Sequence, residues 1–279
     1  MVTRADRLGN RGRPAERPVA AAARELGLDV LTPAKVGAPE VVRDLLALAP
    51  DCLVVAAYGQ ILPSALIDPP AHGAVNVHAS LLPRWRGASP VAHAILAGDA
   101  ETGVSIMRME AGLDTGPVYS MVRVLIEATT TTPTLTATLA ELGAAELVSV
   151  LEAIEHGTAV ATPQPDDGVT YAPRLSRSDG LVDWKVRSAV EVDRMVRALQ
   201  PWPGVLARID SVDVQIHAGG VAEIADGAAP GTIARREGES VVIATVDGGY
   251  RIDSITPPGR RPMTPAAFLR GRQSSAAPR

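Results

Sequence analysis

One short apolar run, residues 53–57, constrains the fold of this chain more than any other feature. It is bounded by Asp51 and Gly59, and a continuous run of this kind is typical of a buried strand in a parallel sheet. Around it, apolar spacing predicts helices over residues 19–26, 39–48, 63–67, 90–97 and 134–156, and strands over residues 30–31, 74–78, 101–109 and 118–126. Strands that alternate with helices predict an α/β domain with a mostly parallel sheet.

The composition changes between residues 157 and 180, where proline, aspartate and glycine are typical of a linker. Beyond it, Ser188 and Glu191 form a capping-box pattern that begins a helix ending near Leu199. Five short strand patterns follow, over residues 205–209, 212–217, 231–234, 240–245 and 250–255. Such a series predicts a small barrel of the oligonucleotide-binding class. We therefore predict a first domain over residues 1–158, a linker over 159–178 and a barrel domain over 179–279.

Composition excludes several classes of protein. An apolar fraction of 46% and a charged fraction of 21% are those of an ordinary globular protein. No apolar run approaches the roughly 20 residues that a membrane-spanning helix needs, so we expect a cytoplasmic protein. The single cysteine, Cys52, excludes an internal disulfide, and its position beside an apolar run favours a small core residue over a catalytic thiol.

The charge is distributed unevenly along the chain. A formal net charge of −4 argues against a generally cationic nucleic-acid binder. Both ends are nevertheless basic, with Arg4, Arg7, Arg11, Arg13 and Arg17 near the start and Arg260, Arg261, Arg270, Arg272 and Arg279 near the other end. Two hypotheses follow: these ends grip a phosphate backbone, or they are solvated tails.

Three polar side chains are predicted to form a proton-handling site. Asn76 and His78 lie in the predicted strand over residues 74–78, and the period of two places them on one face. A loop rich in breakers follows, and a second loop holds Asp114 in a glycine-flanked turn. An amide, an imidazole and a carboxylate that converge from two loops can move protons. The other histidines have no partner at metal-ligand spacing, so no metal is expected.

Several separated blocks, in order, resemble the methionyl-tRNA formyltransferase family over residues 7–272. The blocks are V-V-A-A-Y-G-Q-I-L-P, N-V-H-A-S-L-L-P-R-W-R-G-A-S-P, E-T-G-V-S-I-M-R-M-E-A-G-L-D-T-G, G-V-T-Y-A-P-R-L-S and P-W-P. The wider folate-dependent formyltransferase fold shares only the Asn, the His, the S-L-L-P turn and the Asp. The resemblance implies a Rossmann-like sheet domain followed by a small OB-like β-barrel domain.

The resemblance also implies an activity. Members of the family transfer the formyl group of 10-formyltetrahydrofolate to the α-amino group of methionyl initiator tRNA, at the start of protein synthesis. By this resemblance, Asn76 and His78 stabilise the oxyanion, and either His78 or a water that it orders takes the proton of the amine. Asp114 holds the tautomer of His78 and orders that water. Neither a metal nor a covalent intermediate is needed. The implied partners are folate and initiator tRNA, with no membrane, and we expect a monomer.

The remaining site residues are also carried over by resemblance. The folate is expected to contact three segments, which comprise Tyr58, Gly59, Gln60, Ile61 and Leu62, then Ser80, Leu81, Leu82 and Pro83, then Leu113, Thr115 and Gly116. The tRNA is expected to contact Arg11, Arg13, Arg84, Arg86, Arg260 and Arg261. Ser80 reads as a turn residue rather than a nucleophile, and Trp85 and Arg86 either contact the tRNA end or pack.

The start of the chain departs from the family pattern. The family's arginine-bearing loop follows a strand, a glycine turn and a helix, whereas this chain begins close to that loop. We expect a sheet without its first, central strand, from either a start site placed too late or a shortened form. The alternatives are a weakly active or non-catalytic folate- or tRNA-binding form, a formyltransferase that acts on a glycinamide ribonucleotide or an amino sugar, and a folate hydrolase.

Overall fold

The computed structural model describes residues 1–8, 14–225 and 227–275. They form two compact units. The first comprises Met1–His78, Val104–Val122 and Gly143–Val169, and the second comprises Ala79–Gly103, Arg123–Leu142 and Thr170–Arg279. Two strands and one helix contribute residues to both units, so the units do not follow the linear order of the chain. The domain ranges drawn from the sequence stay a prediction.

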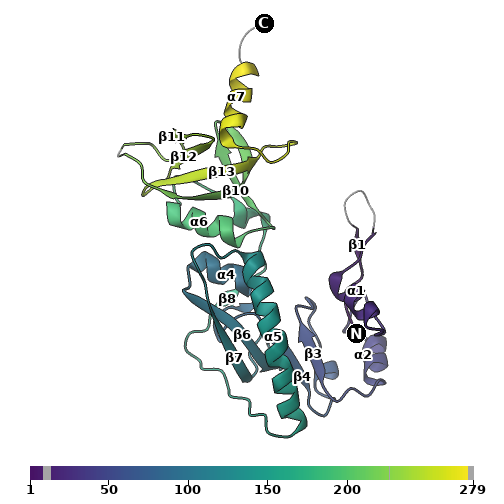
Figure 1. Cartoon of the computed structure of the whole chain (residues 1–279). Coiled ribbons are helices and arrows are strands. Elements are labelled where there is room, and N and C mark those ends of the chain that lie inside the picture. Colours follow the sequence, from purple (N-terminus) through teal and green to yellow (C-terminus); the bar gives the residue numbers. More distant parts are fainter. Residues whose placement is uncertain (9–13, 226, 276–279) are drawn as a thin grey trace. The chain divides into compact units, whose positions relative to one another are not determined.

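A four-stranded sheet holds the predicted site strand in its interior (Figure 1). Its order is β3 (Leu53–Ala56), β4 (Ala74–His78), β6 (Glu101–Arg108) and β7 (Val118–Leu125). β3 runs parallel to β4, whereas β6 runs antiparallel to it, with Ser105 opposite His78. The predicted α/β class is confirmed, and the sheet is mixed because the chain re-enters it beside the carboxyl end of β4.

The strand β3 is less buried than its apolar sequence predicts. Val54 is 48% exposed, and Ala56 is exposed as well. Because alternate residues of a strand point to opposite faces, the face of β3 that carries Val54 and Ala56 is exposed; among the described residues β3 is also an edge strand, with β4 as its neighbour. The parallel pairing was predicted correctly, and burial on both faces was wrong.

Short helices of the first unit begin and end close to where the sequence predicts. They are α1 (Pro18–Glu25), α2 (Pro39–Leu46) and α3 (Ser64–Ile67), and α1 and α2 each begin with proline in the first turn. Val36, Val42, Leu45 and Leu66 form a buried cluster there. The predicted strand over residues 30–31 is reduced to one parallel bridge between Leu31 and Val2. A pair of two-residue strands, β1 (Arg7–Leu8) and β2 (Pro14–Ala15), was not predicted.

The long helix α5 (Thr132–Glu155) determines which way the site strand faces. A Cβ atom on Gly143 would lie 2.9 Å from Val77 and 3.1 Å from Val104, so the helix backbone approaches the sheet closely at this point. Because neighbouring residues of a strand point to opposite faces, Asn76 and His78 lie on the face away from Gly143.

The second unit contains small elements that the sequence did not predict. β5 (Arg86–Gly87) pairs in parallel with β8 (Tyr171–Ala172), which lies in the segment predicted as a linker. A 3₁₀ helix, η2 (Arg177–Gly180), follows. The helix α4 (Pro90–Ala97) has its predicted bounds and ends at Gly98, whose φ of 74° is left-handed.

The five strands that the sequence predicted as a small barrel near the carboxyl end form an antiparallel sheet. Their order is β11 (Ile233–Glu237), β12 (Ser240–Ala244), β13 (Gly249–Thr256), β10 (Val212–Ala222) and β9 (Val205–Ile209). The helix α6 (Ala189–Ala198) packs against β10 (Figure 1), and α7 (Pro265–Ser275) follows the sheet. α7 was missed because its sequence carries little apolar periodicity.

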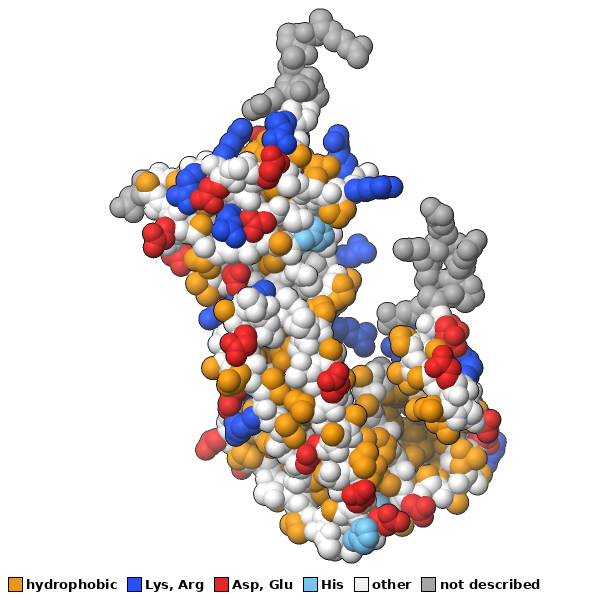
Figure 2. Space-filling model, viewed as in Figure 1, with side chains coloured by type: hydrophobic (Ala, Val, Ile, Leu, Met, Phe, Trp, Pro, Cys, Tyr) orange, Lys and Arg blue, Asp and Glu red, His pale blue; other side chains and the backbone are white. Residues whose placement is uncertain are grey.

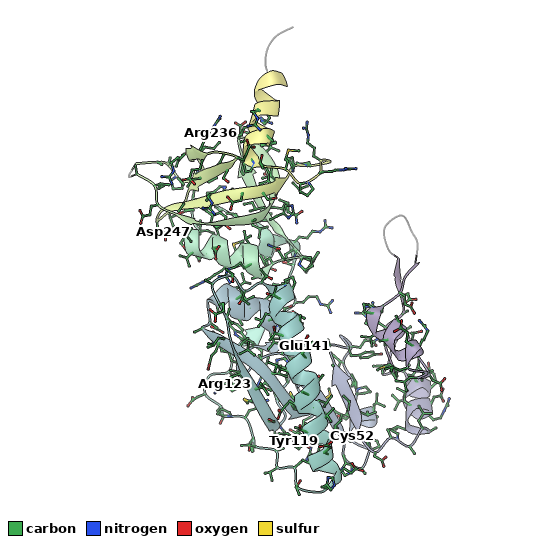
Figure 3. All side chains as sticks on the ribbon, viewed as in Figure 1. Cys52, Tyr119, Arg123, Glu141, Arg236 and Asp247 are labelled. Carbon is green, nitrogen blue, oxygen red and sulfur yellow. The ribbon has the colours of Figure 1, made fainter. Side chains whose placement is uncertain are left out.

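The start of α6 confirms the predicted capping box. The Ser188 hydroxyl accepts a hydrogen bond from the Glu191 amide, and a Glu191 oxygen accepts one from the Ser188 amide. Asp247, labelled in Figure 3, adds a third acceptor, for the Ala189 amide at 2.9 Å. The first amide groups of this helix are therefore satisfied from a nearby turn as well as from its own cap. Among the described helices, none is long and apolar enough to cross a membrane.

We expect Val192→Ala to lower the free energy of unfolding by about 2 kcal/mol, because it removes two buried methyl groups. Val192 is 0% exposed, whereas Val190 on the same helix is 44% exposed. Val190→Ala is therefore a matched control, with an expected change below about 0.5 kcal/mol. Urea denaturation followed by circular dichroism measures both, and equal losses would contradict this packing.

Candidate active site

His78 and Asp114 lie together in the first unit. His78 is at the carboxyl end of β4 and only 5% exposed, and its Nδ1 atom is 3.6 Å from Oδ2 of Asp114. This separation is longer than the roughly 2.7–3.2 Å of an ordinary N–H···O hydrogen bond, but it is within reach of a charged pair. The carboxylate is therefore placed to orient the imidazole ring and to stabilise it when it carries a proton.

Asn76 shares the face of β4 that carries His78. Across the antiparallel pair, Asn76 lies opposite Met107, and His78 lies opposite the fully buried Ser105. Asn76 itself is half-buried. The amide and the imidazole therefore project from alternate residues of one strand, as the sequence predicted, and the hydrogen bonds of the sheet hold their backbone in place.

The loop that holds Asp114 has a backbone that depends on its glycines. Asp114 has a left-handed φ of 53°, and Gly112 has a φ of 138°, which residues with a side chain rarely adopt. At Gly116, a Cβ atom would lie 1.9 Å from the carbonyl oxygen of Arg108. The glycine-flanked turn seen in the sequence thus lets the loop fold tightly against the end of β6.

A further residue, Gln164, contacts this loop and was missed by the sequence analysis. Its Nε2 atom donates hydrogen bonds to the carbonyl oxygens of Asp114, at 2.8 Å, and Gly116, at 2.7 Å. Gln164 lies between two prolines in a segment predicted only as a linker. No local pattern could identify it, because its contacts depend on a segment far away in the sequence.

The predicted folate segments of the first unit differ in burial. Tyr58 packs against the cluster around Val36, and its hydroxyl is buried without a hydrogen-bond partner among the described residues; burial raises the pKa of Tyr58. Gln60 is held to the segment 34–36, where its Oε1 atom accepts from the Val36 amide at 3.0 Å. In contrast, Ile61 is 94% exposed and Leu113 is 58% exposed. Large apolar side chains with this much exposure are available to a ligand.

The predicted segment of residues 80–83 belongs to the second unit. Ser80 is fully buried, and its hydroxyl donates to the carbonyl oxygen of Arg84 at 2.6 Å, which fits the predicted turn role. Leu82 is also buried. The loop is therefore held by internal contacts of its own.

Arg84 is engaged by a carboxylate within the second unit. Its Nε and Nη2 atoms donate to Asp99 at 2.8 and 2.6 Å, and the indole of Trp85 donates to the same carboxylate at 2.7 Å. The bond to Asp99 raises the pKa of the Arg84 guanidinium, which also lies 4.3 Å from the centre of the Trp85 ring. Of the two hypotheses for Trp85, these contacts favour packing.

The other arginines predicted to contact tRNA differ in their surroundings. Arg86 lies in β5, where its amide donates to the Thr170 carbonyl oxygen. Arg260 and Arg261 are exposed between β13 and α7, and their guanidinium groups have no partner within the described part of the chain. Figure 2 shows further basic side chains around β9–β13, mixed with acidic ones. Arg11 and Arg13 lie outside the described residues.

Cys52 lies at the opposite end of the sheet from His78. It directly precedes β3, whose first residue pairs with Ala74 at the start of β4. Burial raises the pKa of the Cys52 thiol, and Figure 3 shows it beside Tyr119. A depression of about 710 Å³, lined in part by Gly73, Arg108 and Tyr119, opens at this same end and contains no predicted site residue. These features favour the non-catalytic hypothesis for Cys52.

The described residues contain no group of three or more His, Cys, Asp or Glu side chains that could hold a metal ion. His217, for example, contacts Thr256 at 2.7 Å, and burial lowers the pKa of this imidazole. His156 lies at the exposed end of α5, with Nδ1 2.7 Å from the carbonyl oxygen of Glu152. These histidines have partners of an ordinary structural kind.

Two models of known protein families match this chain, and between them they cover most of its length. A model described as formyl transferase matches residues 1–151, and one described as formyl transferase, C-terminal domain, matches residues 174–273. Both parts of the chain thus match formyl transferases. A solved structure with the same fold is HypX from Aquifex aeolicus in complex with tetrahydrofolic acid, with a TM-score of 0.68 and 19% identity. The match covers 99% of this chain and 47% of HypX, so the chain spans about half of that protein and the likeness concerns the fold alone.

Curated relatives narrow the class. The methionyl-tRNA formyltransferase of Gluconobacter oxydans is 47% identical over 275 residues, which cover 98% of this chain and 88% of the relative. That of Paramagnetospirillum magneticum is 46% identical over 255 residues, which cover 91% and 82%. The chain belongs to the methionyl-tRNA formyltransferase family.

We expect Gly116→Ala to displace the Asp114 loop, because the new methyl group would overlap the backbone of Arg108. The predicted loss of stability is about 1–3 kcal/mol, accompanied by a lower rate of formyl transfer. Gly220→Ala is the control, since a Cβ atom there would meet nothing within 4 Å. Thermal unfolding and a formylation assay measure both variants, and unchanged values for Gly116→Ala would contradict the described loop.

Proposed function

We propose that Asn76, His78 and Asp114 catalyse transfer of the formyl group of 10-formyltetrahydrofolate to the α-amino group of methionyl initiator tRNA. The observation that carries the proposal is the 3.6 Å approach of Asp114 to the buried imidazole of His78. Membership of the methionyl-tRNA formyltransferase family supplies the reaction, and the shared face of Asn76 and His78 supports their joint role.

Each residue has a separate task in this proposal. The lone pair of the amine attacks the formyl carbon, a C–N bond forms and the formyl oxygen becomes an oxyanion. Asn76 donates an amide hydrogen to this oxyanion. His78 accepts the proton that the amine loses and returns a proton to the folate nitrogen as its bond to the formyl carbon breaks. Asp114 keeps the imidazole in the required tautomer and stabilises its charged form.

For the folate we propose three contact segments, residues 58–62, 80–83 and 113–116. The exposed side chains of Ile61 and Leu113 support this assignment, because a flat ring system can cover apolar surface that is otherwise in water. At Gly59, a Cβ atom would meet only the side chain of Arg4, at 3.6 Å, so the backbone there leaves room for close approach. In the first unit, Tyr58 supports its segment by packing into the apolar cluster.

For the tRNA we propose contacts to Arg11, Arg13, Arg84, Arg86, Arg260 and Arg261. Arg260 and Arg261 have the strongest support, because they are exposed and their charges are not neutralised by a neighbouring carboxylate in the described residues. Arg84 is the weakest member of the set, since Asp99 already holds its guanidinium. We further propose that the chain acts as a cytoplasmic monomer, with domains over residues 1–158 and 179–279 joined by a linker over 159–178.

We expect His78→Ala to lower kcat by about 10²–10⁴-fold, because the proton acceptor is lost. Asp114→Asn and Asn76→Ala should each lower kcat by a smaller factor, and the KM for folate should change little. His156→Ala is the control, since this histidine is exposed at the end of α5. Steady-state formylation of charged initiator tRNA measures all four variants. Full activity of His78→Ala would refute the proposed mechanism.

We expect the double variant Arg260→Glu, Arg261→Glu to raise the KM for tRNA and to leave the KM for folate unchanged. A plot of the logarithm of the tRNA association constant against the logarithm of the salt concentration has a negative slope. Removal of these phosphate interactions should make that slope shallower, by about 1 for each arginine that pairs with a phosphate. Arg43→Glu is a control with the same kind of charge change on the exposed face of α2. Filter binding of tRNA over a series of salt concentrations tests this, and an unchanged slope would exclude both residues from the interface.

A further inference from the structure

We propose that Gln164 is a positioning residue, which holds the backbone of the Asp114 loop and thereby places the Asp114 carboxylate beside His78. The inference rests on the proposed function, because it assumes that Asp114 acts through His78. The role of Gln164 is carried by two hydrogen bonds to the backbone of the loop.

The geometry of these bonds uses both hydrogens of the side-chain amide. A single nitrogen, Nε2, reaches the carbonyl oxygens of Asp114 and Gly116, at 2.8 and 2.7 Å. An amide nitrogen carries two hydrogens, so each can serve one carbonyl group. The two acceptors flank Thr115, and Gln164 therefore fixes both sides of the residue that follows Asp114.

The segment that carries Gln164 is itself fixed to the strand that leaves the loop. The Val118 amide donates to the Thr162 carbonyl oxygen at 2.8 Å, and the Thr162 amide donates back to Val118 at 2.9 Å. Gln164 lies two residues beyond this bridge. The segment of residues 162–164 therefore makes two contacts here. The backbone bridge at Thr162 holds the strand that follows the Asp114 loop, and the Gln164 amide holds the loop itself.

The loop requires such an external support because of its conformation. Asp114 has a left-handed φ of 53°, which residues other than glycine adopt at a cost in conformational free energy. We therefore expect the loop to relax to another conformation when these hydrogen bonds are removed. Since an error of about 1 Å at a catalytic group can reduce a rate by about 10²-fold, loss of Gln164 should lower turnover more than it weakens folate binding, for which the same loop is a proposed contact.

The experiment uses two substitutions at Gln164 in the full chain. Gln164→Glu keeps the size of the side chain but replaces the donor by an acceptor, and Gln164→Met removes the donor without adding a charge. Each should lower kcat by roughly 10–100-fold, while the KM for tRNA stays within about 3-fold and the KM for folate rises by a smaller factor than kcat falls. If Gln164→Glu fails to fold, Gln164→Met decides the question.

Gln200 provides a matched control. It is half-buried like Gln164, and its Nε2 atom also donates to two carbonyl oxygens, those of Val196 at 2.7 Å and His217 at 2.9 Å. Gln200→Glu should lower the melting temperature as much as Gln164→Glu does, with kcat within about 2-fold of the parent. A loss of kcat that merely follows the loss of stability would be equal in the two variants and would overturn the proposal.

A double-variant cycle tests whether Gln164 acts through Asp114. In an Asp114→Asn background, Gln164→Met should cause little further loss of kcat, because the residue that it positions is already disabled. A full multiplicative loss in that background, a rise in KM alone, or an unchanged kcat in Gln164→Met would overturn the inference. If Asp114→Asn itself leaves kcat unchanged, the proposed catalytic role of Asp114 is refuted as well, which separates the two failures.

Discussion

The close contact between α5 and the sheet at Gly143 is the constraint on which the site depends. Since no side chain separates the helix backbone from Val77, the face of β4 that carries Val77 is covered by the helix. The alternation of the strand then leaves Asn76 and His78 on the other face. Antiparallel β6 covers the edge of β4 and brings the Asp114 loop to the strand, because the loop directly follows the end of β6. The proposed role of His78 thus depends on how the helix packs behind the sheet.

The site combines a rigid part and a part that must be held. Asn76 and His78 lie on a strand with neighbours on both sides, so hydrogen bonds of the sheet fix their backbone. Asp114 lies on a turn with a left-handed backbone, and its position depends on contacts made at a distance along the chain. Enzymes in general need their catalytic groups within fractions of an ångström. In this family member, the support for the carboxylate comes from the segment that follows α5.

Much of the fold could be predicted from the sequence, and the reasons are local. β4, α4 and β9 have their predicted bounds, because apolar alternation, an initial proline and a final glycine are properties of neighbouring residues. Asn76 and His78 were predicted to share a face by the same logic. In contrast, the exposure of Val54, the bonds of Gln164 and the engagement of Arg84 by Asp99 could not be predicted. Each of these features depends on contacts between segments that are far apart in the sequence, and the local sequence pattern does not predict such contacts.

Gly98 illustrates how local and distant requirements can meet in one residue. Its left-handed φ ends α4, and this much can be predicted from the sequence. In the same unit, a Cβ atom at Gly98 would lie 2.1 Å from the guanidinium carbon of Arg194, a residue of α6 that also donates to the carbonyl oxygen of Ala97 at 3.3 Å. Asparagine, which tolerates a left-handed backbone, would satisfy the first requirement, but the flexible side chain of Arg194 would have to move away from the end of α4 to admit its Cβ atom. The missing carbon atom thus both ends one helix and leaves space for an arginine from another helix to reach that end.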